Sequence, residues 1–477
     1  MENPPADRQV RKKRHTGHHT VFALLVSACA TPSPASEPGA AVAPTAIAPT
    51  TATPSSDPTP EPPPKIVSID MGHHHACALW SSGSVSCWGG SIRRQLGRED
   101  TRLRAAPGLV DGLDDAVEIG LSNHLSCARR ADGSVECWGS DHVGGLGDGD
   151  GKQEHSCSAH GCRAAPGPVK GLERASRLQL GDMLHCAVTP DEQRRCWGFD
   201  PLGLFGGQQG DTLHVATPLP DAMPRTRAWA ASGSNACGVR PDGSAWCIGD
   251  DAYGGLGDGA RTHTSCPNRK QCSASPVTVE GLTDVADVTF GDEFACALKA
   301  DGRVACWGTA DAGQLGDGRE AHDRCRVGDA MFDCSPSPVM VKGLDDVAEV
   351  ACGTWHCCAR TNTGAVSCWG QHGAGQLGVD TAADRCTSVS GDVTACSRVP
   401  VAVDRLPKTV DLATSSYATC ALSEDGEVWC WGSDSAGELG DLSEARCRES
   451  DSPLSACSSE PLRVDLDPAA PTADAGE

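Results

Sequence analysis

The chain of 477 residues is poor in aromatic side chains, which make up 4% of it. Eleven of these residues are Trp, against six Phe and two Tyr, so the few rings are mostly indoles. Gly, Pro and Cys are abundant instead, with 55, 32 and 27 residues. Cytosolic proteins rarely keep structural disulfides, so this many cysteines predict a protein of an oxidising compartment.

Positive charge is also scarce, because 40 Lys and Arg residues stand against 63 Asp and Glu residues and leave a net charge of −23. A polyanion is repelled by phosphate backbones, so no nucleic-acid partner is predicted. Recognisable catalytic motifs are missing too, among them the nucleophile elbow, the phosphate loop and HExxH. We therefore predict no catalytic residue, no cofactor and no metal, and a protein that is not an enzyme.

The apolar run near the N-terminus, VFALLVSA (21–28), is too short to span a membrane, because it would rise only about 12 Å as a helix. Basic residues precede it, and this order describes an export signal over residues 1–28. The sequence Val-Ser-Ala-Cys that ends at Cys29 resembles the lipobox of bacterial lipoproteins, in which the cysteine is lipidated and becomes the first residue. We predict a lipid anchor at Cys29 and a location in the cell envelope. An ordinary secretory signal and a secreted protein are the alternative.

Residues 29–65 consist mainly of Pro, Ala and Thr, with almost no large side chains. Nothing in such a segment offsets the entropy of ordering, so we predict a disordered tether. The short tail 468–477 is predicted to be disordered as well. The folded part is expected to span residues 66–467.

Seven pairs of cysteines, each separated by ten residues, repeat along this folded part. The pairs are Cys77 and Cys87, Cys127 and Cys137, Cys186 and Cys196, Cys237 and Cys247, Cys296 and Cys306, Cys358 and Cys368, and Cys420 and Cys430. Trp-Gly follows the second cysteine in six units, and Ile248-Gly249 replaces it in the fourth. A Leu-Gly comes further on, with Phe205-Gly206 as the variant in the third unit.

The stretch CARRADGSVEC (127–137) explains the ten-residue separation. Apolar and polar positions alternate on both sides of Asp132-Gly133, which predicts two short strands around a tight loop. A three-residue loop places Cys127 opposite Cys137, within reach of a disulfide after a small approach. Zinc is the alternative, but a lone pair in each unit lacks the other two ligands.

One such hairpin cannot bury enough surface alone, so neighbouring units must stack. Units of about 50–62 residues provide about four strands each, and seven of them predict an all-β, seven-bladed propeller stapled by disulfides. A straight solenoid is the alternative. It needs polar capping repeats, and neither terminal unit has that character.

The concordant pattern G…CAL..DG.V.CWG…GQLGDG resembles the repeats of the regulator of chromosome condensation family, over residues 66 to about 466. The resemblance implies a seven-bladed propeller in which the Gly and Trp positions are framework. Two activities are associated with this family: nucleotide exchange on a small nuclear GTPase, with chromatin binding, and protein inhibition of β-lactamases by a secreted bacterial member. An exported acidic protein meets neither nuclear partner, so the resemblance favours extracellular protein binding.

A second series of cysteines lies between the Leu-Gly of five units and the strand that follows. The expected loop disulfides join Cys157 to Cys162, Cys266 to Cys272, Cys325 to Cys334, Cys386 to Cys396 and Cys447 to Cys457. Equivalent clamped loops on a ring lie on one face, and variable sequence on a fixed frame is typical of binding surfaces. Stabilised surface loops without a ligand are the alternative.

Cys352 and Cys357 remain and are assigned to each other, although an exchange between Cys357 and Cys358 is open. The Leu-Gly-Asp-Gly motifs suggest a calcium site, because carboxylate oxygens suit this ion. Such sequences are also ordinary turns, and the turn is the favoured interpretation. The run of His73, His74 and His75 suggests a metal site. Packing is the favoured role of His75 and of His356, which occupies the equivalent position in the sixth unit.

We thus predict an envelope-anchored module that binds a protein, or a surface glycan, through clamped loops on one face. A hydrolase with its site in the central channel and a guanine-nucleotide exchange factor are the alternatives.

Overall fold

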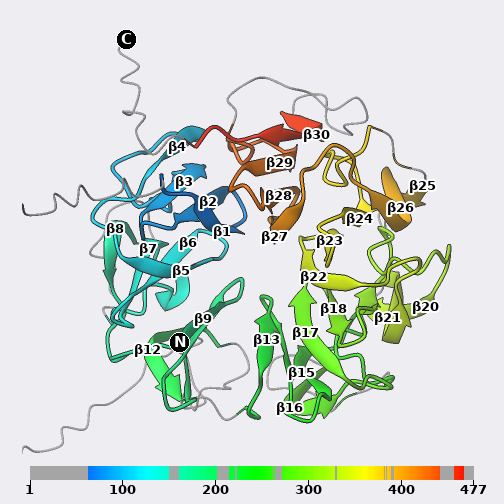
Figure 1. Ribbon diagram of the computed structural model, residues 1–477. Helices are drawn as coiled ribbons and strands as arrows, with labels where there is room; N and C mark the ends of the chain where they lie inside the picture. The colour runs from blue at the N-terminus through cyan, green and yellow to red at the C-terminus, as the bar shows by residue number, and fades with distance from the viewer. Residues whose placement is uncertain are drawn as a thin grey trace, which may run out of the picture. The chain divides into compact units, whose positions relative to one another are not determined.

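Seven antiparallel sheets surround a common axis in the computed structural model (Figure 1). The structure describes residues 63–149, 161–200, 214–220, 223–260, 263, 271–327, 330–380, 382, 384–387, 392–440 and 456–466. All of these residues belong to one unit that spans Pro62–Glu477. The predicted export signal 1–28, Cys29, the tether up to residue 62 and the tail 468–477 lie outside the described residues.

The first strand of each sheet lies nearest the axis and the last lies at the periphery (Figure 1). Blades 1 to 3 comprise β1 (Ile66–Met71), β2 (His75–Trp80), β3 (Val85–Gly89), β4 (Ala105–Leu109); β5 (Ala116–Leu121), β6 (Leu125–Arg130), β7 (Val135–Ser140), β8 (Cys162–Pro168); and β9 (Arg177–Leu180), β10 (Leu184–Val188), β11 (Arg194–Phe199), β12 (His214–Pro220). Blades 4 and 7 comprise β13 (Ala228–Ala231), β14 (Asn235–Val239), β15 (Ala245–Asp250), β16 (Cys272–Thr278); and β27 (Thr409–Thr414), β28 (Ala418–Ser423), β29 (Val428–Ser433), β30 (Cys457–Arg463).

Blades 5 and 6 carry a fifth strand at the outer edge. They comprise β17 (Val285–Phe290), β18 (Phe294–Lys299), β19 (Val304–Thr309), β20 (Asp323–Val327), β21 (Ala330–Met340); and β22 (Val347–Cys352), β23 (His356–Thr361), β24 (Val366–Gln371), β25 (Asp384–Thr387), β26 (Val393–Ala402). The one short helical turn of the described residues is η1 (His142–Gly144), so no helix among them is long and apolar enough to cross a membrane. The predicted all-β propeller with seven blades is confirmed.

The hairpin geometry deduced from CARRADGSVEC is present in the second blade. Cys127 lies opposite Cys137 in the β6–β7 register, and the Arg130 N–H donates to the Ser134 carbonyl at 2.9 Å. Gly133 closes the loop with a φ of 90°, a conformation that L side chains avoid.

All seven ten-spaced cysteine pairs form disulfides, with Cα atoms 4.0 or 4.1 Å apart. Each bond joins the second strand of a blade to the third, as the hairpin geometry predicts. The bonds are Cys77 to Cys87, Cys127 to Cys137, Cys186 to Cys196, Cys237 to Cys247, Cys296 to Cys306, Cys358 to Cys368, and Cys420 to Cys430. Every one of these fourteen cysteines is paired in a disulfide, so the geometry favours the disulfide interpretation over zinc in every blade.

The Trp-Gly tryptophans join six of the seven blades to the blade before them. In six blades the indole N–H donates to the backbone carbonyl that precedes the Leu-Gly of the neighbouring blade, at 2.8 to 3.0 Å. The pairs are Trp88–Glu438, Trp138–Gln95, Trp197–Gly145, Trp307–Gly255, Trp369–Gln314 and Trp431–Gln376. All six indoles are fully buried. The fourth blade has the buried Ile248 at this position and makes no such bond.

The same contact explains the Leu-Gly motif. Gly316 has a φ of 65°, and a β-carbon placed there would lie 2.8 Å from the indole of Trp369. Only glycine satisfies both the left-handed backbone and the close approach of the neighbouring ring. Leu315 beside it is buried in the same core cluster as Trp369.

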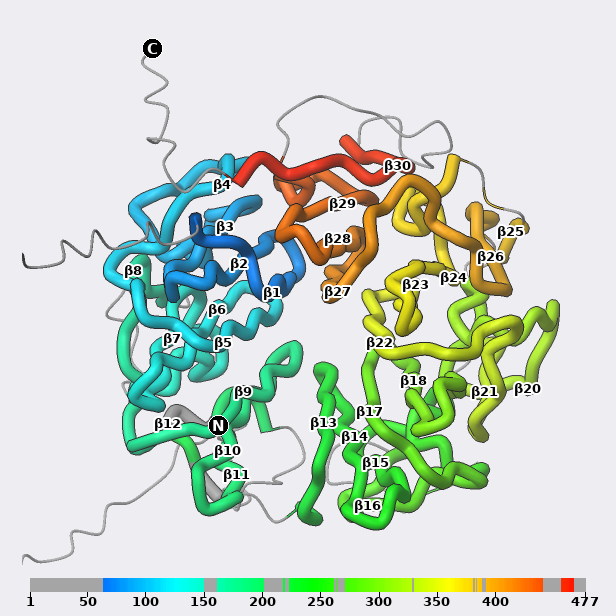
Figure 2. Tube along the Cα trace, viewed as in Figure 1, coloured from blue at the N-terminus to red at the C-terminus, as the bar shows by residue number. Residues whose placement is uncertain are grey.

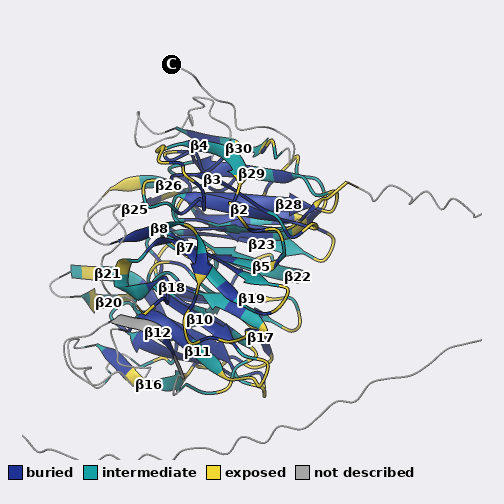
Figure 3. Ribbon diagram, turned by 90° about the vertical axis from the view of Figure 1, so that its left-hand side faces the viewer, coloured by how far each residue is buried: buried dark blue, intermediate teal, exposed yellow. Residues whose placement is uncertain are grey.

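The ring closes by packing of blade 7 against blade 1, because each sheet is built from strands that are consecutive in the chain. Figure 2 shows the first and last blades side by side. The Asp411 carboxylate on β27 accepts hydrogen bonds from the Ile69 N–H at 3.0 Å and the Ser68 hydroxyl at 3.1 Å on β1. Burial raises the pKa of Asp411. The side view shows that the buried residues lie mainly within the blades (Figure 3).

We predict that Gly316→Ala lowers the free energy of unfolding by about 2–4 kcal/mol, since it adds an overlap with Trp369 to the strain of a left-handed alanine. Gly343→Ala is the matched control. Its φ is 74°, but a β-carbon there meets nothing within 4 Å, so only the backbone strain of about 1–2 kcal/mol is expected. Denaturant unfolding of the oxidised protein measures both, and equal losses would contradict the role assigned to the Trp369 contact.

Candidate protein-binding face

One face of the propeller collects the turns that vary most between blades. Because successive strands alternate in direction, the turn between the first and second strands and the loop between the third and fourth emerge on the same side. In blade 1 these segments are residues 72–74 and 90–104. We call this side the mouth face.

A cavity of about 370 Å³ opens at the centre of the mouth face. Each blade contributes the residue four places before its first ten-spaced cysteine. These lining residues are His73, Asn123, Asp182, Gly233, Asp292, Thr354 and Ser416. Backbone hydrogen bonds join some neighbouring turns, such as the one from the Thr354 N–H to the Ser416 carbonyl at 3.2 Å. Burial, with a further contribution from Asp182, raises the pKa of Asp292.

Two of the histidines singled out in the sequence are structural. The Nε2 of His75 lies 2.8 Å from the hydroxyl of Ser126, and the Nε2 of His356 lies 2.9 Å from that of Thr419. Burial lowers the pKa of His356 to about 3 and that of His75 well below its usual value, so both rings are neutral. They bridge neighbouring blades beneath the mouth, in agreement with the packing role expected from the sequence.

The clamped insertions of blades 5 and 6 are hairpins rather than irregular loops. In blade 5, β19 ends where Thr309 pairs with Cys334, and β20 continues the pairing with residues 330–334. Blade 6 repeats this arrangement, because Gln371 pairs with Cys396 and β25 pairs with residues 393–396. Both hairpins therefore extend past the end of the third strand, and Figure 3 shows them on the same side of the ring.

Disulfides hold both hairpins closed. Cys325–Cys334 and Cys386–Cys396 each have Cα atoms 5.8 Å apart. The blade 5 hairpin also reaches the preceding blade, because the ring of Phe332 packs edge-on against Tyr253 with centroids 5.0 Å apart. The disulfides thus close both hairpins, and the ring contact fixes the blade 5 hairpin against blade 4.

The other three loop pairs are described at one end only. Cys162, Cys272 and Cys457 are disulfide-bonded. Their predicted partners Cys157, Cys266 and Cys447 lie outside the described residues.

The structure resolves the assignment of Cys352 and Cys357, which face each other across β22 and β23 and form a disulfide. Cys358 is bonded to Cys368, so the open exchange does not occur in this structure. The sulfur of Cys357 lies 3.8 Å from that of Cys296 in the preceding blade. Although Cys296, Cys352 and Cys357 bring three sulfurs together, all three are in disulfides and hold no thiolate for a metal ion.

Exposed apolar side chains are present on the mouth face. Of the ten large apolar residues that are exposed among those described, five lie there, on loops, turns or clamped hairpins. They are Ile92, Leu103, Met331, Val393 and Tyr417. Single exposed apolar residues are ordinary, so these five support a contact surface only together with the clamped hairpins.

The Leu-Gly-Asp sequences act as turns in the described residues. The Asp258 carboxylate accepts the Ala260 N–H at 3.0 Å, and that of Asp317 accepts the Arg319 N–H at 3.1 Å. Asp148 pairs with Arg163 at 2.6 Å. These contacts favour the turn interpretation over calcium.

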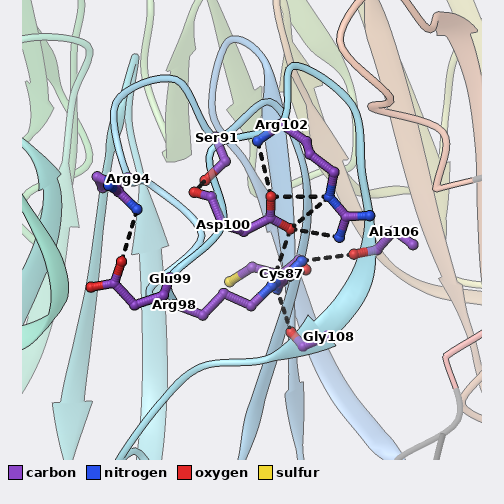
Figure 4. Close-up of polar contacts among 9 residues, drawn as sticks. All are labelled: Cys87, Ser91, Arg94, Arg98, Glu99, Asp100, Arg102, Ala106 and Gly108. Atoms are coloured by element: carbon purple, nitrogen blue, oxygen red, sulfur yellow. Dashed lines mark hydrogen bonds and ion pairs between the residues drawn. The ribbon is translucent and has the colours of Figure 1, made fainter. Parts of the chain in front are cut away.

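Blade 1 lacks a second cysteine pair, and a buried arginine organises its loop instead (Figure 4). The Arg98 guanidinium donates to the carbonyls of Cys87, Ala106 and Gly108 at 2.7 to 2.8 Å. Asp100 lies 3.8 Å away and pairs with Arg102 at 2.8 Å. Sequence reasoning missed this network, although Arg98 follows Leu96-Gly97 where four other units have Asp.

Comparison with protein families gives partial matches along the chain. Models of the regulator of chromosome condensation (RCC1) repeat match residues 301–360, and also residues 285–314, 347–376 and 410–438. The ultraviolet-B receptor UVR8 of Arabidopsis thaliana is 27% identical over 394 residues, which cover 81% of each chain. The E3 ubiquitin-protein ligase HERC2 of Homo sapiens is 30% identical over 251 residues, but the match spans only 5% of that ligase.

Solved structures share the fold. Prp20p from Saccharomyces cerevisiae superposes with a TM-score of 0.61 at 16% sequence identity, over 84% of this chain and 87% of its own. Human WBSCR16 gives a TM-score of 0.55 at 18% identity, over 80% and 93% of the two chains. The Prp20p study describes its binding to Gsp1p and histones.

We predict that Arg98→Met lowers the free energy of unfolding by about 3 kcal/mol, because three carbonyls lose a charged donor in a buried setting. Arg98 is 8% exposed. Arg102→Met is the control, since the Arg102 side chain is 56% exposed and its loss is expected to cost less than about 1 kcal/mol. Denaturant unfolding distinguishes them, and the assignment is wrong should both variants match the wild type.

Proposed function

Because the chain carries RCC1 repeats built into a seven-bladed propeller, we propose that it is a protein-binding module whose mouth face contacts the partner. The observation that carries the proposal is the pair of disulfide-clamped hairpins that project from that face. Each is held at its base by a disulfide, and the blade 5 hairpin is also held by a ring contact to the preceding blade. A fixed frame of this kind limits the entropy lost on binding.

The relatives support a binding role over a catalytic one. Prp20p, which shares the fold, is described as binding Gsp1p and histones, and UVR8 is named as a receptor. The ligase activity of HERC2 belongs to a protein of which this chain matches 5%, so it is not carried over. Nucleotide exchange is the second activity that this relationship suggests, and a cytosolic protein with reduced cysteines would favour it.

We further propose that the propeller acts outside the cytoplasm, held at the cell envelope by a lipid on Cys29. The supporting observations are the signal-like residues 1–28 and the lipobox-like sequence at Cys29. The many disulfides fit an oxidising compartment. A partner in this location is a protein or a surface glycan, and nuclear partners are excluded from the proposal.

Photocrosslinking tests the mouth face. A benzophenone amino acid at Met331 or Val393 is expected to give a discrete adduct with the partner in cells that produce the protein. The same probe at Leu109 is the control, because Leu109 is exposed at the outer end of β4, away from the mouth face. The double variant Cys386→Ser/Cys396→Ser is expected to reduce the adduct from Val393, because it frees the hairpin. Equal adducts from all three positions would contradict a specific face.

Fractionation tests the anchor separately. Cys29→Ser is expected to move the protein from the membrane fraction to the soluble fraction, because it removes the lipid attachment point, whereas Ala30→Ser is expected to leave it in the membrane. Mass spectrometry of the N-terminal peptide measures the lipid directly. A soluble wild type that lacks residues 1–28 would favour the secreted alternative and leave the crosslinking result unaffected.

A further inference from the structure

Three neighbouring blades bring three imidazoles and one carboxylate together at the edge of the mouth. His73 and His74 lie in the turn between β1 and β2, His124 lies in the equivalent turn of blade 2, and Asp182 lies in that of blade 3. These four residues, which we call the histidine quartet, span more than a hundred positions of the sequence. Only the ring arrangement places them side by side.

Contacts link the members of the quartet in series. The Nε2 of His73 lies 3.2 Å from the Oδ1 of Asp182. The rings of His73 and His74 have centroids 6.3 Å apart, and those of His74 and His124 are stacked with centroids 5.7 Å apart. His124 and Asp182 both line a pocket of about 260 Å³, which leaves room for an ion and water.

One ring nitrogen of the quartet is open to a ligand. The Nδ1 of His124 is buried and has no hydrogen-bond partner among the described residues. An imidazole nitrogen of this kind is what a transition metal binds.

We propose that the histidine quartet binds a divalent transition-metal ion such as Zn²⁺, with His73, His74, His124 and Asp182 as the ligands. Imidazole and carboxylate together suit Zn²⁺, Cu²⁺ and Ni²⁺ better than the hard ions that prefer oxygen alone. The sequence directed attention to His73, His74 and His75 as a run. In the structure His75 is buried and packs between blades, and His124 and Asp182 lie beside His73 and His74 as the other candidate ligands.

Binding requires two side chains to turn. His73 and Asp182 already lie within contact distance, but no three ligand atoms of the quartet lie within 4.8 Å of one another in this structure. The side chains of His73 and His74 are 37% and 44% exposed, so both can rotate, and His74 then leaves a contact with Glu438 at 3.3 Å. Arg93 also lines the pocket, and its charge opposes the cation. An ion held there would link blades 1, 2 and 3 on the mouth face.

Zinc titration tests the inference independently of the proposed partner. Isothermal titration of the oxidised full chain with ZnCl₂ is expected to show one more bound ion than the variant His73→Ala/His124→Ala. The difference is needed because the full chain carries further histidines, such as His15, His18 and His19, and an imidazole outside the quartet can also bind Zn²⁺. The single variant Asp182→Asn is expected to weaken this extra site by about tenfold or more, since even the loss of an outer-shell partner has that effect.

His322→Gln is the matched control, because it removes another imidazole–carboxylate pair, His322 to Asp317 at 3.1 Å, from blade 5. This variant is expected to keep the extra ion. Zn²⁺ is also expected to raise the melting temperature of the wild type and not that of His73→Ala/His124→Ala, and EDTA is expected to reverse the rise. Circular dichroism confirms that the variants are folded. Equal zinc stoichiometry in the wild type and the double variant would overturn the proposal.

Discussion

The hydrogen bond from a buried indole to the carbonyl of the preceding blade is the contact on which the propeller depends. It fixes the distance between adjacent sheets and explains three features of the repeat together: the Trp, the glycine that approaches it and the leucine beside that glycine. A chain with few aromatic residues uses most of its indoles for this purpose. An indole N–H that is fully buried loses its bonds to water, and the carbonyl of the neighbouring blade replaces them in these six blades.

Two kinds of link therefore stabilise the propeller, disulfides within the blades and side-chain hydrogen bonds between them. Disulfides such as the one from Cys296 to Cys306 act inside a blade, where each joins the second and third strands of a hairpin. Tryptophans and carboxylates such as Asp411 act between blades, where the interface is formed only after the ring assembles. A reducing agent acts directly on the first kind of link only, so we expect reduction to weaken individual blades before it weakens the contacts between them.

The sequence predicted what depends on local spacing. Cys127 and Cys137 revealed the hairpin, and the repetition of the pair revealed the number of blades. It could not reveal what depends on assembly. Arg98 organises blade 1 by donating to carbonyls that the local strand geometry presents to it. His73 meets Asp182 only because the ring brings the turns of blades 1 and 3 within reach of each other. The clamped insertions show the same limit of the sequence. Their cysteines predicted closed loops, but only the structure shows that β20 pairs with β21 and makes the blade 5 insertion a hairpin.

Ile248 gives the circle one boundary that differs from the rest. Ile248 has no N–H to donate toward blade 3, and Arg194 of blade 3 lies over the ring of Trp229 in blade 4, 4.6 Å from its centroid. The same guanidinium donates to the Pro224 carbonyl at 3.1 Å and to the Thr226 hydroxyl at 3.2 Å. A flexible arginine side chain therefore holds this junction where a rigid indole holds the other six, and we expect blades 3 and 4 to be the first pair to part under mechanical load.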